Sequence, residues 1–177
     1  MIDYTKEEII ALMEENPEKF NDWKKESGEE IDLSETDFSN MTLKDLDLSE
    51  VDLNSSSFSD CVLSAINFTG ADLSSVDFTR AKVVECDFTD SYMAGADCSY
   101  AEITYSNFSG TDMAGCILSE TVLTNSDLSS CENLSSSRFD EDTVWPEEDM
   151  MPNDFDSACT SDLSALKDDE DNTIGDY

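Results

Sequence analysis

The sequence predicts an all-β solenoid: a four-sided parallel β-helix of about five to six coils with an α-helical N-terminal cap. The first observation is that an apolar residue recurs at every fifth position from Leu33 to Leu128, twenty times without an insertion. A five-residue period fits neither the 3.6 residues per turn of an α-helix nor the two-residue alternation of a strand. It fits a chain that makes one short extended side and one corner per repeat, as stacked solenoids do.

The second observation is a period of twenty residues superimposed on the first. Six phenylalanines form two columns with this spacing: Phe38, Phe58 and Phe78 in one, Phe68, Phe88 and Phe108 in the other. Twenty residues make four pentads, so each coil has four sides and the two columns lie on opposite sides. Aliphatic centres such as Leu33 occupy the remaining sides, and alternating wide and narrow columns would fill a square cross-section. We expect these seven residues to form the core.

Residues 1–30 are predicted to form a helical cap. Thr5 and Glu8 have the spacing of a capping box, and apolar residues follow them at helical spacing. Asn16 and Pro17 end one helix and begin another. Because an open coil exposes its core and its backbone groups, we expect this segment to cover the first coil. A partner-binding helix is the alternative.

Residues 31–140 are assigned to the array, and each pentad has the same internal pattern around its apolar centre. The residue two places before the centre is apolar or small, so it is expected to face inward with the centre. The residue immediately before the centre is mostly Asp or Asn and is expected to face solvent. The residue after the centre is mostly Ser or Thr, whose hydroxyl can bond nearby backbone at a corner.

The regular pattern ends near the C-terminal side of the array. Leu134 and Phe139 continue the columns only after a single-residue insertion. Residues 141–152 are predicted to close the solenoid, with Trp145 over the last coil and Pro146 preventing further strand pairing. Residues 153–177 are acidic and poor in large apolar residues, so we predict that they form a disordered tail.

Charge limits the kinds of partner. The chain carries 43 Asp plus Glu against 9 Lys plus Arg, with no His, for a formal charge of −34. Such a chain repels phosphates, which excludes direct binding to nucleic acid and disfavours anionic membranes. We therefore expect partners with basic surfaces. The alternative is that the acidity only keeps the chain in solution.

The sequence contains no pattern typical of catalysis or of cofactor binding. It lacks histidine, a glycine-rich phosphate loop, zinc-ligand spacing, and a Ser or Cys nucleophile with a base. We predict no enzyme activity, no cofactor and no metal, with most cysteines buried as small core residues. No apolar run reaches membrane-spanning length and no signal-peptide core is present, which favours a cytoplasmic protein.

The repeats resemble the pentapeptide-repeat family, whose unit is A-(D/N)-(L/F)-x-x. GADLS at 70–74 and GADCS at 95–99 show the unit, and the resemblance covers about residues 31–140. The lead-in FNDWKKES and the ending FDEDTVWPE also look like those of many cyanobacterial members. The resemblance implies a right-handed four-sided β-helix.

The resemblance also implies a kind of activity. The best understood members resemble duplex DNA in shape and charge and bind type II topoisomerases in its place, among them the quinolone-resistance proteins and their mycobacterial relatives. This chain has no loop between its coils, so it is nearer to the loop-free type than to the loop-bearing resistance proteins. The C-terminal dimerising helix of the loop-free type is not evident.

The array matches duplex DNA in linear charge density. Residues 31–130 contain 18 acidic and 3 basic residues, a net charge of −15. Five coils at a strand spacing of about 4.8 Å give a rod of about 24 Å, and B-DNA of that length carries about 14 charges. We therefore predict that columns of outward carboxylates bind the partner: Asp32, Glu35, Asp37, Asp47, Asp52, Asp60, Asp72, Asp77, Asp87, Asp97, Asp112 and Asp127.

Two functions stay open. The first is a DNA mimic that occupies the DNA-binding surface of a DNA-handling protein, such as DNA gyrase, another topoisomerase or a defence nuclease. The second is a structural or scaffolding repeat protein whose acidity serves solubility only. The third side of each coil is less charged, with Val62 and Lys82 before its centres and Tyr105 at its edge. This side is a candidate contact surface, so a homodimer also stays open.

Overall fold

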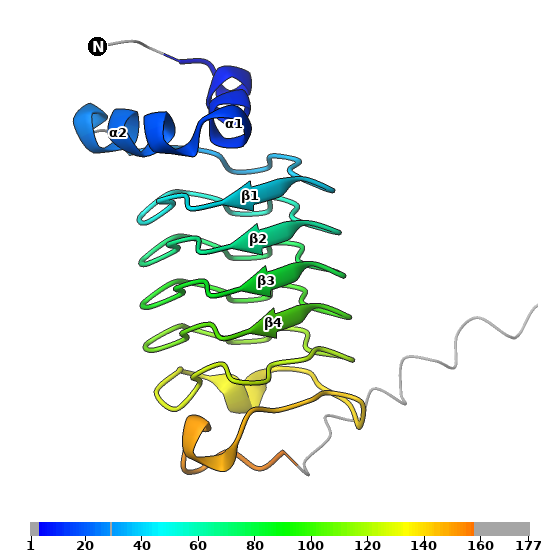
Figure 1. Ribbon diagram of the computed structural model, residues 1–177. Helices are drawn as coiled ribbons and strands as arrows, with labels where there is room; N and C mark the ends of the chain where they lie inside the picture. The colour runs from blue at the N-terminus through cyan, green and yellow to red at the C-terminus, as the bar shows by residue number, and fades with distance from the viewer. Residues whose placement is uncertain (1–3, 29, 158–177) are drawn as a thin grey trace, which may run out of the picture.

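The computed structural model describes residues 4–28 and 30–157, which form a rod of stacked coils capped by two helices (Figure 1). The chain advances one coil every twenty residues, so that residues far apart in sequence lie above one another. The architecture is a right-handed, four-sided β-helix, as the two periodicities and the resemblance predicted. None of the helices in the described part of the chain is long and apolar enough to cross a membrane.

The cap consists of α1 (Lys6–Glu15) and α2 (Pro17–Ser27). Thr5 begins α1 with the predicted capping box, because its hydroxyl accepts from the Glu8 N–H and the Glu8 carboxylate accepts from the Thr5 N–H. Asn16 ends α1 and caps α2 by accepting from the Lys19 N–H. The cap covers the first coil, with Phe20 fully buried in the same core as the array.

One side of the rod forms regular strands. They are β1 (Thr42–Lys44), β2 (Val62–Ser64), β3 (Lys82–Val84) and β4 (Glu102–Thr104), which pair in parallel in the order β1-β2-β3-β4. The other three sides make single parallel bridges in the same twenty-residue register. We name the sides by their order along the chain, so that pentads starting at 31, 36, 41 and 46 begin sides 1, 2, 3 and 4. The strands lie on side 3, opposite side 1.

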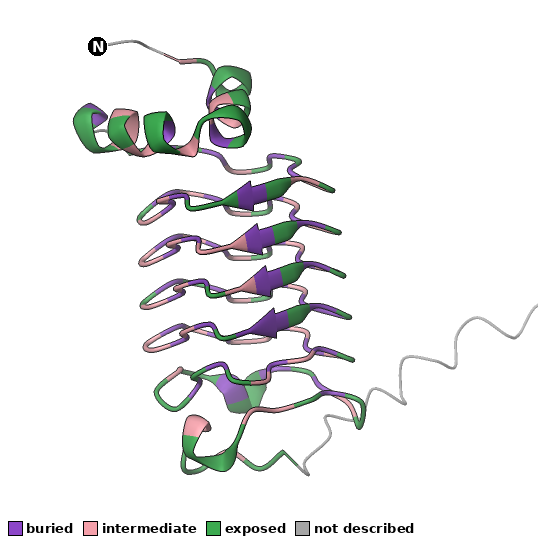
Figure 2. Ribbon diagram, in the orientation of Figure 1, coloured by how far each residue is buried: buried purple, intermediate pink, exposed green. Residues whose placement is uncertain are grey.

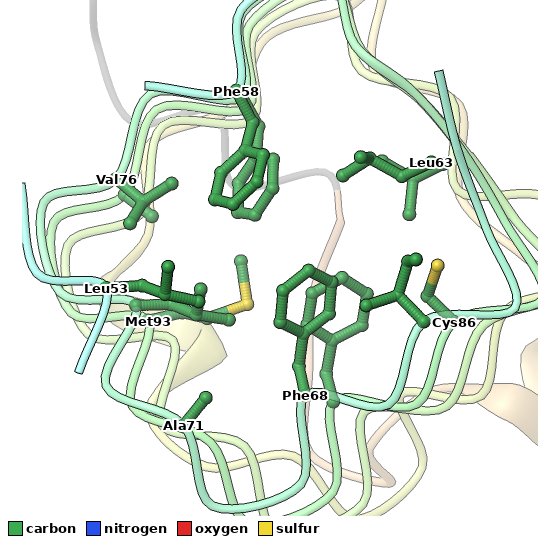
Figure 3. Close-up of a cluster of buried hydrophobic side chains, with 14 of the residues drawn as sticks. Leu53, Phe58, Leu63, Phe68, Ala71, Val76, Cys86 and Met93 are labelled. Atoms are coloured by element: carbon green, nitrogen blue, oxygen red, sulfur yellow. The ribbon is translucent and has the colours of Figure 1, made fainter. Parts of the chain in front are cut away.

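The interior is filled by the predicted columns of centres (Figures 2 and 3). Leu33 and all six column phenylalanines are buried. Within a column the rings stack, with centroids 4.8 Å apart for Phe88 and Phe108. Across the interior the two columns meet edge to face, with centroids 6.1 Å apart for Phe58 and Phe68. The two phenylalanine columns therefore project from opposite sides, sides 2 and 4, and meet in the middle of the rod.

The corners from Glu35 to Asn125 use the left-handed backbone conformation. At every fifth residue from Glu35 to Asn125, φ lies between 52° and 71°. Only four of these corner residues are glycine, namely Gly70, Gly95, Gly110 and Gly115. Because side chains with a Cβ are disfavoured in this region, most corners carry backbone strain. The sequence pattern did not predict this left-handed conformation, since many residue types occur at the corner position.

The last coil departs from the five-residue spacing more than the sequence indicated. Leu134 and Phe139 are buried after the predicted insertion, which includes the short 3₁₀ helix η1 (Leu134–Ser136). Two further single-residue insertions follow, since Leu118 bonds Arg138, Leu123 bonds Val144 and Leu128 bonds Met150. Trp145 thus lies beneath Leu123, and η2 (Glu148–Met150) lies beneath Leu128. Val122 and Val144 form the last parallel bridge of the described chain, so none follows Pro146, although the Leu128 N–H still donates to the Met150 carbonyl.

The C-terminal part of the described chain ends in an aromatic cluster. Phe155 lies against Trp145 and Phe139, with ring centroids 4.9 Å and 5.5 Å away. Residues 153–157, predicted from the sequence as the start of a disordered tail, are therefore among the residues that the structure describes. The rest of the acidic segment predicted as a disordered tail, 158–177 with Cys159, lies outside the described residues.

Candidate functional site

Where an aspartate precedes a centre, its outward carboxylate also accepts a backbone hydrogen bond within the turn. Asp87 shows the arrangement, because its Oδ1 accepts from the Thr89 N–H at 3.0 Å and from the Thr89 hydroxyl at 2.5 Å. Asn67 and Asn107 accept the same backbone bond in their own pentads. The hydroxyl after the centre therefore bonds the carboxylate in these turns, where the sequence pattern predicted a backbone acceptor. Most of these aspartates are half-buried, so the expectation of free solvent exposure holds only in part.

Side 1 carries the longest acidic column. Parallel bridges connect Asp32 to Asp52, Asp52 to Asp72, and Tyr92 to Asp112. Tyr92 replaces the carboxylate in the fourth coil, and Glu132 continues the column below Asp112. At the corner after this side, Glu35 is exposed at φ 54°.

Sides 2 and 4 carry interrupted columns. On side 2, Ser57 lies between Asp37 and Asp77, and Ile117 follows Asp97. On side 4 the aspartates alternate with amides in the order Asp47, Asn67, Asp87, Asn107, Asp127. The alternation lowers repulsion, since the Asn107 amide donates to Asp87 in the coil above at 3.3 Å. Side 4 thus holds its carboxylates two coils apart, whereas on side 2 Asp77 and Asp97 still lie in adjacent coils.

Three of the predicted partner-binding carboxylates are paired with cations of the same chain. Lys6 lies 3.7 Å from Asp32 and Lys24 lies 3.2 Å from Asp47, so the cap neutralises part of the first coil. Arg80 holds Asp60 through two bonds of 2.7 Å and 2.8 Å. Within the described chain, by contrast, Asp52, Asp72 and Asp112 form no ion pair, so the middle of side 1 is not neutralised in this way.

The charges are distributed unevenly around the rod. Over residues 31–130, sides 1 and 4 each carry five acidic residues and no basic one, and side 2 carries five acidic residues and one basic. Side 3 carries three acidic and two basic residues. Acidic surface therefore wraps three consecutive sides, centred on side 1, while the opposite side is close to neutral.

Corner positions add a set of acids that the fold does not require. Seven corners carry a carboxylate in the left-handed conformation: Glu35, Asp45, Glu50, Asp60, Glu85, Asp90 and Glu120. All seven residues are exposed. Glycine or asparagine would occupy the same backbone conformation at lower cost. These side chains add charge without relieving the strain of the corner.

Hydrogen bonds keep several carboxylates ionised. The Ser34 hydroxyl and backbone N–H donate to Asp32 at 2.6 Å and 2.9 Å, and together with Lys6 they lower the pKa of Asp32. Burial acts to raise the pKa of Asp47, but bonds from Ser49 and Lys24 outweigh it and the pKa is lowered. Asp32 and Asp47 therefore keep their charge to lower pH than an ordinary aspartate does.

The cysteines have the properties of core residues. Burial raises the pKa of Cys61 and Cys86 to about 11, so both thiols are protonated at neutral pH. The Cys61 thiol lies 2.9 Å from the Phe38 carbonyl and donates to it. No group of three or more His, Cys, Asp or Glu residues in the described ranges is arranged to hold a metal ion.

Stacked four-sided coils with acidic columns on their surface define the class of protein, a β-helical solenoid. A family model described as pentapeptide repeats matches this chain in eight copies, over residues 31–70, 71–104 and 106–141. The chain belongs to the pentapeptide repeat family. No curated protein sequence matches it.

Several solved structures are similar in fold. Rfr23, a pentapeptide repeat protein from the cyanobacterium Cyanothece 51142, is 18% identical, with 66% of this chain and 85% of that chain covered and a TM-score of 0.43. QnrB1, a plasmid-mediated fluoroquinolone resistance protein, is 21% identical, with 62% and 57% covered and a TM-score of 0.45. A pentapeptide repeat protein from the Arabidopsis thaliana thylakoid lumen is 26% identical, with 67% and 70% covered and a TM-score of 0.34. Family membership rests on the repeat model, since all three TM-scores are below 0.5.

Proposed function

We propose that this protein is a non-enzymatic DNA mimic, which occupies the DNA-binding surface of a DNA-handling protein. The observation that carries the proposal is the match in linear charge density. The array holds a net charge of −15 over five coils, or about 24 Å, against about 14 charges on B-DNA of that length. Because the charge wraps three consecutive sides, a basic groove would meet acidic surface over most of the rod's circumference.

The carboxylates in the middle of sides 1 and 2 are the proposed contact. Asp52 and Asp72 lie one coil apart, at a spacing of about 4.8 Å, and neither forms an ion pair with a cation of residues 4–28 or 30–157. Asp77 lies on the adjoining side at the level of the third coil. Long-range attraction from this surface would steer a cationic partner toward it.

A type II topoisomerase is the first partner to test, since the resemblance of the repeats implies it, and a defence nuclease is the second. A mimic must share a compartment with its target, so the proposal includes a cytoplasmic location. The scaffold hypothesis also has an observation in its favour, because aspartates such as Asp87 serve the turns of the coil. Acidity at these positions is therefore partly structural.

The decisive experiment compares two triple variants in gyrase supercoiling and DNA-competition assays. Asp52→Asn/Asp72→Asn/Asp77→Asn removes three charges from sides 1 and 2 and keeps the turn acceptors, as Asn67 and Asn107 do naturally. The matched control, Asp45→Asn/Glu85→Gln/Glu102→Gln, removes three charges from side 3 and its edge. We expect the first variant to lose inhibition by about tenfold and the control to retain it.

Ionic strength provides the second part of the test. Inhibition by the unmodified chain should weaken as salt rises from about 50 to about 300 mM, since screening shortens the reach of surface charges. If both triple variants lose inhibition equally, net charge alone, and not the position of the carboxylates, causes the inhibition. If no DNA-binding protein of a bacterial lysate is retained on the immobilised chain, the scaffold hypothesis replaces the mimic.

A further inference from the structure

Side 3 has the features of a protein contact rather than of a charged surface. It is the side that forms regular strands, and four of its six outward positions carry Thr or Val, where the other sides mostly carry aspartate. Val62 and Val144 are 42% and 43% exposed. A cationic partner would bind the acidic sides. A partner that binds side 3 must therefore present a less basic and more apolar surface.

Two tyrosines flank this side at strained positions. Tyr100 and Tyr105 lie at the corners on either side of β4, with φ of 63° and 56°. They are 57% and 63% exposed, so neither ring gains much from burial in the single rod. The coil itself imposes this backbone conformation at its corners, so the evidence lies in the exposed rings, and tyrosine is enriched at protein interfaces.

The outward column of side 3 is complementary to itself when reversed. From the first coil to the sixth it reads Thr42, Val62, Lys82, Glu102, Val122, Val144. If a second column runs in the opposite direction, Lys82 faces the partner's Glu102, and Val62 faces the partner's Val122. At the corner, Tyr100 then faces the partner's Arg80, a pair suited to a cation–π contact.

We propose that side 3 binds a second copy of this chain, with the two rods antiparallel and related by a two-fold axis between β3 and β4. In such an interface the same patch serves both subunits. Lys82 and Glu102 already form an ion pair of 3.4 Å within one chain, so the dimer completes a square of alternating charges. Parallel rods would place Lys82 on the partner's Lys82, which selects the antiparallel arrangement.

The dimensions and charge of the rod define how strong this dimer is. Five residues of about 3.3 Å and six coils of about 4.8 Å give a face of roughly 450 Å² per subunit, about half of a standard interface. Two chains with a charge of −34 also repel each other. The dimer is therefore weak, and salt strengthens it by screening the repulsion. Salt weakens DNA mimicry, so the two proposals fail independently.

Sedimentation velocity of the full chain tests the proposal, from about 10 μM to about 1 mM at about 0.1 and 0.5 M NaCl. We expect a monomer–dimer equilibrium whose dissociation constant falls as salt rises. Lys82→Glu should weaken the dimer by about tenfold, because it places two carboxylates opposite each other. The swap Lys82→Glu/Glu102→Lys should return the dissociation constant to within about threefold.

The matched control is Lys25→Glu on α2, which changes the net charge by the same amount away from side 3. It should leave the dissociation constant unchanged. Circular dichroism establishes that each variant is folded, which is expected because Lys82 and Glu102 are about half exposed. A monomer under every condition overturns the proposal, and so does a dimer that ignores Lys82→Glu or is not restored by the swap.

Discussion

At the scale of the residue, the aspartate that precedes the centre in ten of the twenty pentads performs two tasks. Its Oδ1 accepts the N–H of the residue two places on, which stabilises the turn, and its charge remains on the surface. Asparagine performs the first task without the second, as Asn107 shows. The pair of residue types therefore separates the contribution to folding from the contribution to binding.

We predict that Asp87→Ala destabilises the fold by about 1–2 kcal/mol, because the Thr89 N–H loses its acceptor in a half-buried turn. Asp87→Asn should change stability by less than about 0.5 kcal/mol, since the acceptor remains. Urea unfolding followed by circular dichroism measures both variants. Equal destabilisation by the two substitutions would show that charge, and not the turn acceptor, matters at this position.

Several inward residues two places before a centre are Ser or Thr, although they lie in the core. Thr111, Thr121 and Ser126 are fully buried, yet each hydroxyl donates to a backbone carbonyl 23 residues earlier. The bond crosses from one coil to the one above it. A small polar residue therefore satisfies a carbonyl of the neighbouring coil and also fills the narrow space beside the centre.

At the scale of the element, the corner decides which residues are tolerated. Glu85 has φ of 56°, a conformation in which asparagine is less strained than glutamate. We predict that Glu85→Asn stabilises the chain by about 0.5–1 kcal/mol in urea unfolding. Glu102→Gln removes the same charge from an ordinary strand and should not reproduce the gain. If both variants gain equally, relief of repulsion and not backbone strain is the cause.

The last coil shows that the five-residue spacing is not required at the end of the array. The Met113 to Leu128 part of the array keeps its five-residue spacing, but Trp145 and Phe139 fill wider positions in the coil below. A coil that covers only one neighbour is free to bulge, because no later coil must match its register. Insertions there do not propagate into the array.

At the scale of the whole molecule, acid should destabilise the fold once repulsion is screened. The pKa values of Asp32 and Asp47 are lowered in the folded state. Their contribution is therefore present above the unfolded value of about 4 and is lost as pH falls through the lower folded values. Thermal melting from about pH 7 to about pH 3 in about 0.5 M NaCl should show a falling midpoint below about pH 4. A midpoint that rises throughout would mean that repulsion still dominates.

Much of this molecule could be predicted from its sequence because its contacts repeat. Once the twenty-residue period is recognised, Phe88 must lie between Phe68 and Phe108, and Asp72 must lie below Asp52. The handedness came from the family resemblance. The same period assigned each aspartate to a side, because residues twenty positions apart lie in the same column.

The four-sided β-helix, its helical cap and its columns follow from the amino-acid pattern, because a strict period leaves one way to bury every fifth side chain. The pairing of carboxylates with Lys6, Lys24 or Arg80 and the left-handed corners became visible in the folded chain alone. The tertiary structure also extended the last coil past Pro146. These features depend on contacts between the array and its ends or between adjacent corners, where side-chain reach and backbone strain matter and periodicity carries no information.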